Sequence, residues 1–248
     1  MTLQNDDQLN GLRRVCRLVA QVLAAMQEHA RPGMTTAELD AFGERLLLRG
    51  GASPAPRKVY GFPGATCISV NEEVAHGIPG DRVLAPGDVV NVDVSAELDG
   101  YFGDTGGSFV IPPSDALKER LLATTRRARD DGIRAAIDGG LVSHVSKAIE
   151  RVAKRTGFRV IRNLTSHGVG GALHEEPAIY NYFDPRDTRR LHAGQVITVE
   201  PFLATKSSRV EERDDGWTLA VRRGSHGAQF EHTIVVTQGA PLILTVPG

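Results

Sequence analysis

The chain has 248 residues, 41% of them hydrophobic, a composition typical of a globular protein with room for one large domain or two small ones. Its 29 lysines and arginines nearly balance its 30 aspartates and glutamates, so we expect no nucleic-acid partner, because domains that bind nucleic acid carry a basic excess. Two cysteines are too few for a disulfide framework, and no apolar run approaches the roughly 20 residues of a membrane span, so we expect a cytoplasmic protein without a membrane partner.

The first ten residues are polar and resemble no secretory signal, and a long helix is predicted to begin among them. Asp6 and Asp7 are its candidate N-caps, and it should end near residues 31–33, where arginine, proline and glycine follow one another. Its apolar residues recur at three- and four-residue steps, which is typical of a helix that buries one face. They are Leu9, Leu12, Val15, Val19, Val22, Leu23 and Met26.

A second helix opens with a capping box, in which Thr35 is followed three residues later by Glu38. It should run to the two glycines at 50–51, because glycine commonly ends helices. The pattern then changes to strands. Residues 59–70 are predicted to form an extended stretch broken by glycine and proline, and residues 89–94 are rich in valine.

The order of two helices followed by strands then recurs. Ser114 and Asp115 are predicted to cap a helix that runs to about Asp138. Glycines at 139–140 interrupt it, and a further helix spans roughly residues 143–156, with strand-like segments after it. The chain therefore has the pattern of an internal duplication.

Aligning Gly33 with Gly140 gives an offset of 107 residues, and the same offset carries Asp93 onto Glu200. Each of these two acids lies in a valine-rich strand. Equivalent strands related by a pseudo-twofold axis would bring both carboxylates toward one central cleft. We therefore predict an α/β fold made of two pseudo-symmetric halves. The predicted single domain spans residues 1–248, with halves of about 5–112 and 113–248.

The segment 91–104 predicts a β-hairpin in which the aspartate and glycine at 99–100 form a two-residue type I′ turn. This register sets Asp104 opposite Ser95 and diagonal to Asp93, so both carboxylates lie on one face of the hairpin. Taken alone, two such acids are more often ordinary turn or edge residues. A metal or catalytic site needs further ligands.

Three further candidate ligands follow downstream: His167 before a glycine-rich stretch, and Glu200 and Glu231 beside β-branched residues. Four carboxylates that converge in the interior cannot all stay ionised without cations. Two divalent metals would balance the four charges, with a neutral imidazole completing the set. Oxygen ligands with one nitrogen suit Mn²⁺, Fe²⁺, Co²⁺ or Zn²⁺ and disfavour a cysteine-based structural zinc site.

Seven motifs in this order make the chain resemble the type I methionine aminopeptidases, and the resemblance extends from the first helix to Val246. It implies the pita-bread fold, a pseudo-symmetric α/β domain whose curved antiparallel sheet holds two metals. The motifs are Asn-Glu-Glu-Val-Ala-His-Gly-Ile-Pro (71–79), Asn-Val-Asp-Val (91–94), Gly-Asp-Thr (103–105), His-Gly-Val-Gly (167–170), His-Glu-Glu-Pro (174–177), Val-Glu-Pro (199–201) and Glu-His-Thr-Ile-Val-Val (231–236).

The resemblance also implies the roles of individual residues in a two-metal hydrolysis of the first peptide bond. Glu200 would shuttle the proton of the attacking water, and His76 and His174 would contact the substrate and donate to the oxyanion. On spacing alone, either histidine would more often be structural. The implied metal ligands are Asp93, Asp104, His167, Glu200 and Glu231, with Asp104 and Glu231 bridging the two ions.

The predicted pocket for the first side chain matches the family at Phe62, Cys67 and Trp217, an apolar and sulfur-tolerant set. Core packing is the alternative explanation for the tryptophan. The chain departs from the family at two positions, with Val59 where tyrosine is usual and Leu173 where phenylalanine is usual. We expect one aromatic wall of the pocket to be missing unless Tyr60 turns in to replace it.

These observations predict a monomeric methionine aminopeptidase that acts on N-terminal peptides, with nascent chains at the ribosome among its substrates. One alternative is a same-fold aminopeptidase of broader or Xaa-Pro specificity, but such relatives carry an extra N-terminal domain, and only about 70 residues precede the motif at 71–79. The other is an inactive module that binds nascent chains. The complete ligand set disfavours this second alternative.

Overall fold

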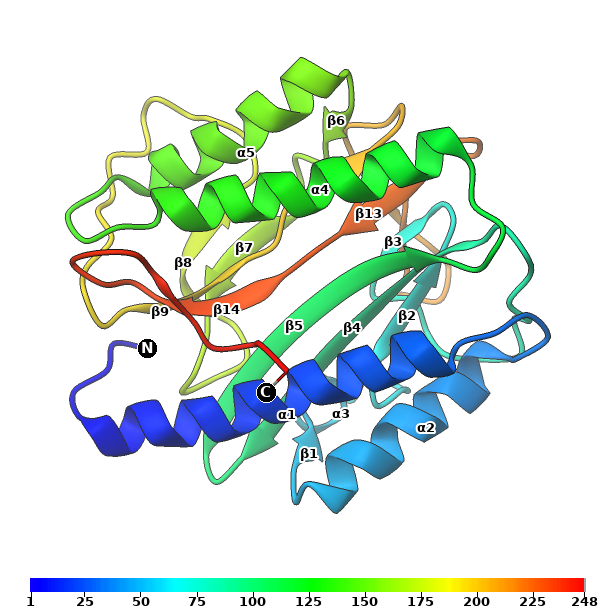
Figure 1. The fold of residues 1–248 in the computed structure, drawn as a ribbon, viewed down its shortest axis with the longest axis horizontal. Helices are drawn as coiled ribbons and strands as arrows, with labels where there is room; N and C mark the ends of the chain where they lie inside the picture. The colour runs from blue at the N-terminus through cyan, green and yellow to red at the C-terminus, as the bar shows by residue number, and fades with distance from the viewer. Residues whose placement is uncertain (248) are drawn as a thin grey trace.

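The computed structural model describes residues 1–247, in which two pairs of helices enclose antiparallel sheets. Figure 1 shows α1 (Asp6–His29) and α2 (Thr36–Arg49) on one side of the strands, and α4 (Ala116–Ala135) and α5 (Val142–Thr156) on the other. This arrangement confirms the predicted α/β fold with pseudo-symmetric halves. No helix among the described residues is long and apolar enough to cross a membrane.

The ends of the first two helices differ in how well the sequence predicted them. The N-cap of α1 is Asn5, whose side chain accepts from the backbone N–H of Gln8, so the predicted caps Asp6 and Asp7 were wrong. Both aspartates lie in the first turn, where negative charge favours the helix dipole. The predicted capping box of α2, with its cap at Thr35, is confirmed.

A short helix, α3 (Ala55–Tyr60), precedes the stretch 59–70 that was predicted to be extended, and its last two residues fall within that stretch. A proline in its first turn is pre-set for helical geometry. Gly61, in the left-handed conformation with φ of 70°, ends the helix. Gly61, one of the glycines that indicated a broken strand, is therefore a helix stop signal, and the strand β2 (Cys67–Val70) begins only later.

The N-terminal sheet is built on the predicted hairpin of β4 (Val89–Leu98) and β5 (Tyr101–Val110). Asp99 and Gly100 have φ of 54° and 83°, as a type I′ turn requires. Ser95 pairs with Asp104, which confirms the predicted register. On the other edge, β4 pairs with β2 and with β1 (Ser53–Pro54).

The C-terminal sheet has five antiparallel strands in the order β15-β14-β9-β7-β8. The remaining strands form two three-stranded sheets, in the orders β13-β10-β6 and β11-β12-β3. The strands of the large sheet are β7 (Thr165–Gly168), β8 (Glu175–Tyr180), β9 (Val196–Val199), β14 (His232–Val235) and β15 (Leu242–Ile243). The others are β3 (Glu73–Ala75), β6 (Arg159–Val160), β10 (Phe202–Ala204), β11 (Glu211–Glu212), β12 (Leu219–Ala220) and β13 (Gly227–Gln229).

Matching backbone hydrogen bonds recur in the two halves, and three of the four residue pairs that they relate are 106 or 107 residues apart, close to the predicted offset, while the fourth pair, Ile111 and Val236, is 125 residues apart. The glycines in these bonds all have positive φ, a conformation that side chains disfavour. This recurrence supports an internal duplication, while the single domain and the boundaries of its halves stay predictions. The N–H groups of Gly33 and Gly139 donate to the carbonyls of Leu84 and Leu191, and those of Gly87 and Gly194 donate to Ile111 and Val236.

Alternation along β4 explains how a buried strand presents acids to a cleft. Val90, Val92 and Val94 are fully buried and pack with α1 in one hydrophobic core. Because successive side chains of a strand point to opposite faces, Asp93 and Ser95 face away from this core. They point into a cavity, and a second core lies between the C-terminal sheet and the helices α4 and α5.

Candidate metal centre and active site

A cavity of about 370 Å³ is lined by residues from both halves of the chain. Nine of the ten predicted site residues line it, from an acidic part to an apolar part. The tenth, Glu231, is a fully buried residue close to Asp104 and His167. The nine are Phe62, Cys67, His76, Asp93, Asp104, His167, His174, Glu200 and Trp217.

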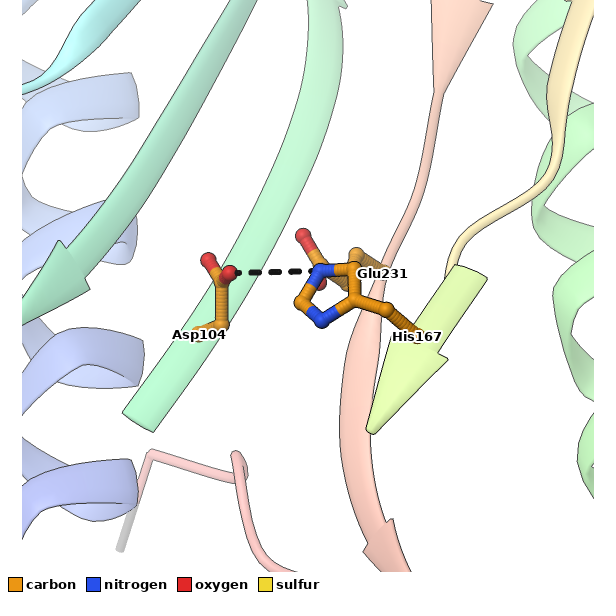
Figure 2. Close-up of side chains that lie close together, drawn as sticks. All are labelled: Asp104, His167 and Glu231. Atoms are coloured by element: carbon orange, nitrogen blue, oxygen red, sulfur yellow. Dashed lines mark ion pairs between the residues drawn. The ribbon is translucent and has the colours of Figure 1, made fainter. Parts of the chain in front are cut away.

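The tightest group of potential metal ligands is formed by Asp104, His167 and Glu231, whose ligand atoms all lie within 4.8 Å of one another. Figure 2 shows the three side chains pointing toward one another from separate segments. Asp104 lies on β5 and His167 on β7. Glu231 lies in the two-residue link between β13 and β14, directly before β14. Nε2 of His167 lies 3.8 Å from Oδ2 of Asp104.

The other two predicted ligands adjoin this group. Oε1 of Glu200 lies 3.1 Å from Nε2 of His167, and the hydroxyl of Thr198 donates to the same oxygen at 2.9 Å. Asp93 faces the cavity from β4, opposite Cys67 of β2. The sequence-predicted set therefore converges on one locus, with strands of both sheets supplying it.

Gln229 belongs to this locus and was missed by the sequence reasoning. Its side-chain amide donates to Oε2 of Glu231 at 3.0 Å and to Oδ2 of Asp93 at 3.4 Å, so it holds the two carboxylates in place. Gly106 leaves room for it, because a Cβ there would lie 2.2 Å from Oε1 of Gln229. A signal was present in the sequence: Gln229 precedes Glu231 by two residues, the spacing at which strand side chains share a face.

Two carboxylate oxygens of the group have no hydrogen-bond partner among the described residues. They are Oδ1 of Asp104 and Oε1 of Glu231, and both are buried. A buried acceptor without a partner costs free energy, and a buried carboxylate costs more. Unpaired carboxylate oxygens beside an imidazole are suitable ligands for a divalent cation, so these residues fit a metal.

The pKa values of the acids support the same interpretation. Burial, and then the charge of Glu200, raises the pKa of Asp93 to about 7. Burial and the neighbouring carboxylates also raise the pKa of Asp104 and of Glu231 well above their usual values. Without a cation these groups retain protons, and a bound divalent ion would replace those protons.

The two other predicted histidines border the acidic group. His174 lies beside His167, with ring centroids 4.3 Å apart. Loss of hydration lowers the pKa of His174 to about 3, and the nearby rings of His167 and His76 act in the same direction. Loss of hydration also lowers the pKa of His76. Both are therefore neutral donors at neutral pH. His76 has a positive φ of 55°, which is uncommon outside glycine.

The apolar part of the cavity brings the predicted pocket residues together. Phe62 and Trp217 contact edge to face with centroids 5.2 Å apart, and Leu173 lines the same space. Burial raises the pKa of the Cys67 thiol well above its usual value, so the group is neutral and apolar here. These contacts make a compartment suited to a medium-sized apolar side chain.

Of the two outcomes expected for the position of Val59, the structure has the one in which Tyr60 supplies the aromatic ring. Val59 is 42% exposed and does not line the cavity. Tyr60, which follows Val59 and is the last residue of α3, turns toward the cavity instead. It supplies an aromatic ring at the rim of the cavity. The family pattern did not indicate the direction in which the side chains at the end of α3 point.

The model of metallopeptidase family M24 matches residues 10–238. Methionine aminopeptidase 2 of Bacillus subtilis is 44% identical over 99% of this chain and 99% of its own length, and a methionine aminopeptidase of Staphylococcus epidermidis is 44% identical over 99% and 98%. The crystal structure of methionine aminopeptidase from Thermotoga maritima is 33% identical, with a TM-score of 0.95 over 99% of both chains.

Prolidase from Pyrococcus furiosus has the same fold, with a TM-score of 0.79 and 21% identity, but this chain covers only 65% of it. The similarity to the methionine aminopeptidases is thus closer in sequence and extends over the whole length of both chains. The chain therefore belongs to metallopeptidase family M24, as a metal-dependent aminopeptidase with the pita-bread fold of its methionine aminopeptidases.

Proposed function

We propose that this enzyme removes the N-terminal methionine from peptides and proteins by hydrolysing the first peptide bond. One observation carries the proposal: a single cavity joins an acidic group of metal ligands to an apolar compartment. A substrate whose first side chain fills the apolar part would present its first carbonyl to the acidic part. An unbranched thioether side chain suits a compartment lined by Phe62, Cys67 and Trp217.

The proposed cofactor is a pair of divalent ions of cobalt, manganese, iron or zinc. When bound, such a pair supplies a hydroxide nucleophile at neutral pH and polarises the scissile carbonyl. The count of two is supported by the four carboxylates, three of them buried and Asp93 half-buried, whose charges two divalent ions would balance. The proposed ligands are Asp93, Asp104, His167, Glu200 and Glu231, with Asp104 and Glu231 shared between the ions.

The remaining residues would bind the substrate and move protons. Glu200 is the proposed proton shuttle, because its carboxylate adjoins His167 and faces the cavity. His76 and His174 are the proposed donors to the oxyanion that develops on the carbonyl. Their low pKa values keep both rings neutral, so each can donate one N–H without adding charge to the site.

We further propose a monomeric enzyme of the cytoplasm that acts on nascent chains at the ribosome. Both cysteines are free and buried, which suits a reducing compartment. Analytical ultracentrifugation tests the monomer, and cosedimentation with translating ribosomes tests the association.

The decisive experiment compares peptides that differ only in the first residue. Protein reconstituted separately with each of the four metals should hydrolyse Met-Ala-Ser with a kcat/KM well above that for Leu-Ala-Ser and Pro-Ala-Ser, and should contain two ions per chain. Comparable rates for all three peptides would indicate a broad aminopeptidase. Metal binding without turnover of any peptide would indicate a binding module instead.

A further inference from the structure

A hydrogen bond at the rim of the cavity joins the hydroxyl of Tyr60 to Nδ1 of His174 at 2.6 Å. The two rings also contact each other, with centroids 5.5 Å apart. Both residues line the cavity, and Tyr60 is 48% exposed. The phenol therefore lies between bulk solvent and the imidazole that is the proposed oxyanion donor.

The local structure fixes Tyr60 in this place. Tyr60 is the last residue of α3, and the left-handed Gly61 turns the chain sharply, so that Tyr60 and Phe62 both reach the cavity from one short segment. An ion pair between Lys58 and Glu97 joins α3 to β4, the strand that carries Asp93. The tyrosine is thus held by the same framework that holds the metal ligands.

The direction of the hydrogen bond follows from the surroundings of the imidazole. A neutral imidazole carries one N–H, and its other nitrogen accepts. If Nδ1 carried the proton, the lone pair of Nε2 would be left toward a cavity that already contains the carboxylates of Asp104 and Glu200. If Tyr60 donates to Nδ1, Nε2 carries the proton, and no group among residues 1–247 engages it.

We propose that Tyr60 is a positioning residue that holds His174 in the tautomer whose Nε2–H donates into the cavity. The proposal rests on the proposed function, in which this N–H stabilises the oxyanion. Tyr60 would act through His174 and would not touch the reacting atoms. Its effect should therefore appear in the transition state and leave ground-state binding of the peptide little changed.

The first test is Tyr60→Phe, which keeps the ring and removes only the hydroxyl. We expect kcat for Met-Ala-Ser to fall about three- to tenfold with KM unchanged, the effect of one hydrogen bond. Tyr180→Phe is the matched control, because Tyr180 is 38% exposed on β8, is not part of the cavity lining, and should keep full activity. In the His174→Ala background, Tyr60→Phe should cause no further loss.

The second test reads the tautomer without turnover. In metal-free protein labelled with ¹⁵N-histidine, the His174 resonances, assigned with His174→Gln, should show an unprotonated Nδ1 and a protonated Nε2. Tyr60→Phe should shift them toward a mixture of tautomers. A protonated Nδ1 in the unmodified protein, an unchanged kcat in Tyr60→Phe, or losses that add in the double variant would each overturn the proposal. Failure of the unmodified enzyme to hydrolyse Met-Ala-Ser would contradict the proposed function, while the tautomer measurement would still decide the role of Tyr60.

Discussion

The two parts of the cavity are built in different ways. The acidic part is carried mainly by strands or the residues that adjoin them, and its carboxylates are buried, except the half-buried Asp93, and incompletely paired. The apolar part is carried mainly by loops and by the end of α3, with Phe62 just after a left-handed glycine and Trp217 in a turn beside Asp215, while Cys67 alone of the predicted pocket residues lies on a strand, β2. The framework of the first is the hydrogen-bonded sheet, and the framework of the second is side-chain packing.

This difference indicates which property each part controls. The regular pleat of a strand fixes the direction of each side chain, which suits ligands that must converge on an ion. Loops vary more easily without disturbing the core, which suits a compartment that determines specificity. We therefore expect substitutions in the acidic part to affect catalysis strongly, and substitutions in the apolar part to affect the preference for the first residue.

The largest effect is expected from Asp104→Ala and from Glu231→Ala. Each residue is proposed to contact both metals, so either change should abolish turnover and lower the metal content below two ions per chain. Steady-state kinetics and elemental analysis of the same preparations measure both. Glu119→Ala, at an exposed acid of α4, is the control and should retain both properties. Near-normal activity in either ligand variant would contradict the proposed metal site.

The next largest effect is expected from His174→Ala. Its proposed contact with the oxyanion forms chiefly in the transition state, so kcat should fall about 10²- to 10³-fold while KM changes little. Metal content should stay normal, because His174 is not a proposed ligand. A raised KM with an unchanged kcat would make His174 a residue that binds the substrate in the ground state.

Removal of the metals should make stability depend on pH through the buried acids. The pKa of Asp93 is raised to about 7 in the folded protein against 3.8 as its ordinary value, so the folded state retains a proton that the unfolded state has lost. The lowered pKa values of His76 and His174 make a contribution to stability that rises with pH in this range, whereas the contribution of Asp93 to the stability of the metal-free protein should fall as pH rises from about 4 to 7. Asp104 and Glu231 act in the same direction.

Thermal unfolding of the metal-free and the metal-loaded enzyme across this pH range measures the effect. The loaded enzyme should gain stability from ion binding, about 2.7 kcal/mol when free metal is 100 times Kd. In metal-free Asp93→Asn the loss of stability with rising pH should be smaller. A dependence of stability on pH that is the same in metal-free Asp93→Asn as in the unmodified metal-free protein would contradict the raised pKa of Asp93.

The sequence predicted the acidic part better than the apolar part for a physical reason. A two-residue turn fixes the register of a hairpin, so the pairing of Asp104 with Ser95 followed from Asp99 and Gly100 alone. The contact of Gln229 with Asp93 joins residues 136 apart, and no local pattern encodes such a contact. The convergence of the five ligands needed the family resemblance as well as periodicity.

The ends of helices and the loops were predicted less well. The short helix α3 has only six residues, too few for a hydrophobic period, and its proline and glycine are equally compatible with a broken strand. That ambiguity hid the contact of Tyr60 with His174. The same ambiguity left open whether Val59 leaves a gap in the pocket or Tyr60 fills it, because the direction of a side chain depends on the type of element that carries it.

The smallest effect is expected in the apolar part, where Leu173 replaces the usual phenylalanine and Val59 the usual tyrosine. Leu173 lines the cavity and is buried, whereas Val59 is exposed outside it. Restoring the ring in Leu173→Phe should narrow the compartment and raise the ratio of kcat/KM for Met-Ala-Ser over Leu-Ala-Ser severalfold. Apolar pockets separate side chains by only about 1–3 kcal/mol per methylene, so the ratio should change far less than catalysis does in His174→Ala. Val59→Tyr is the matched control and should leave the ratio unchanged. If Val59→Tyr alters the ratio and Leu173→Phe does not, selectivity is controlled from the rim of the cavity, and the apolar lining has no part in it.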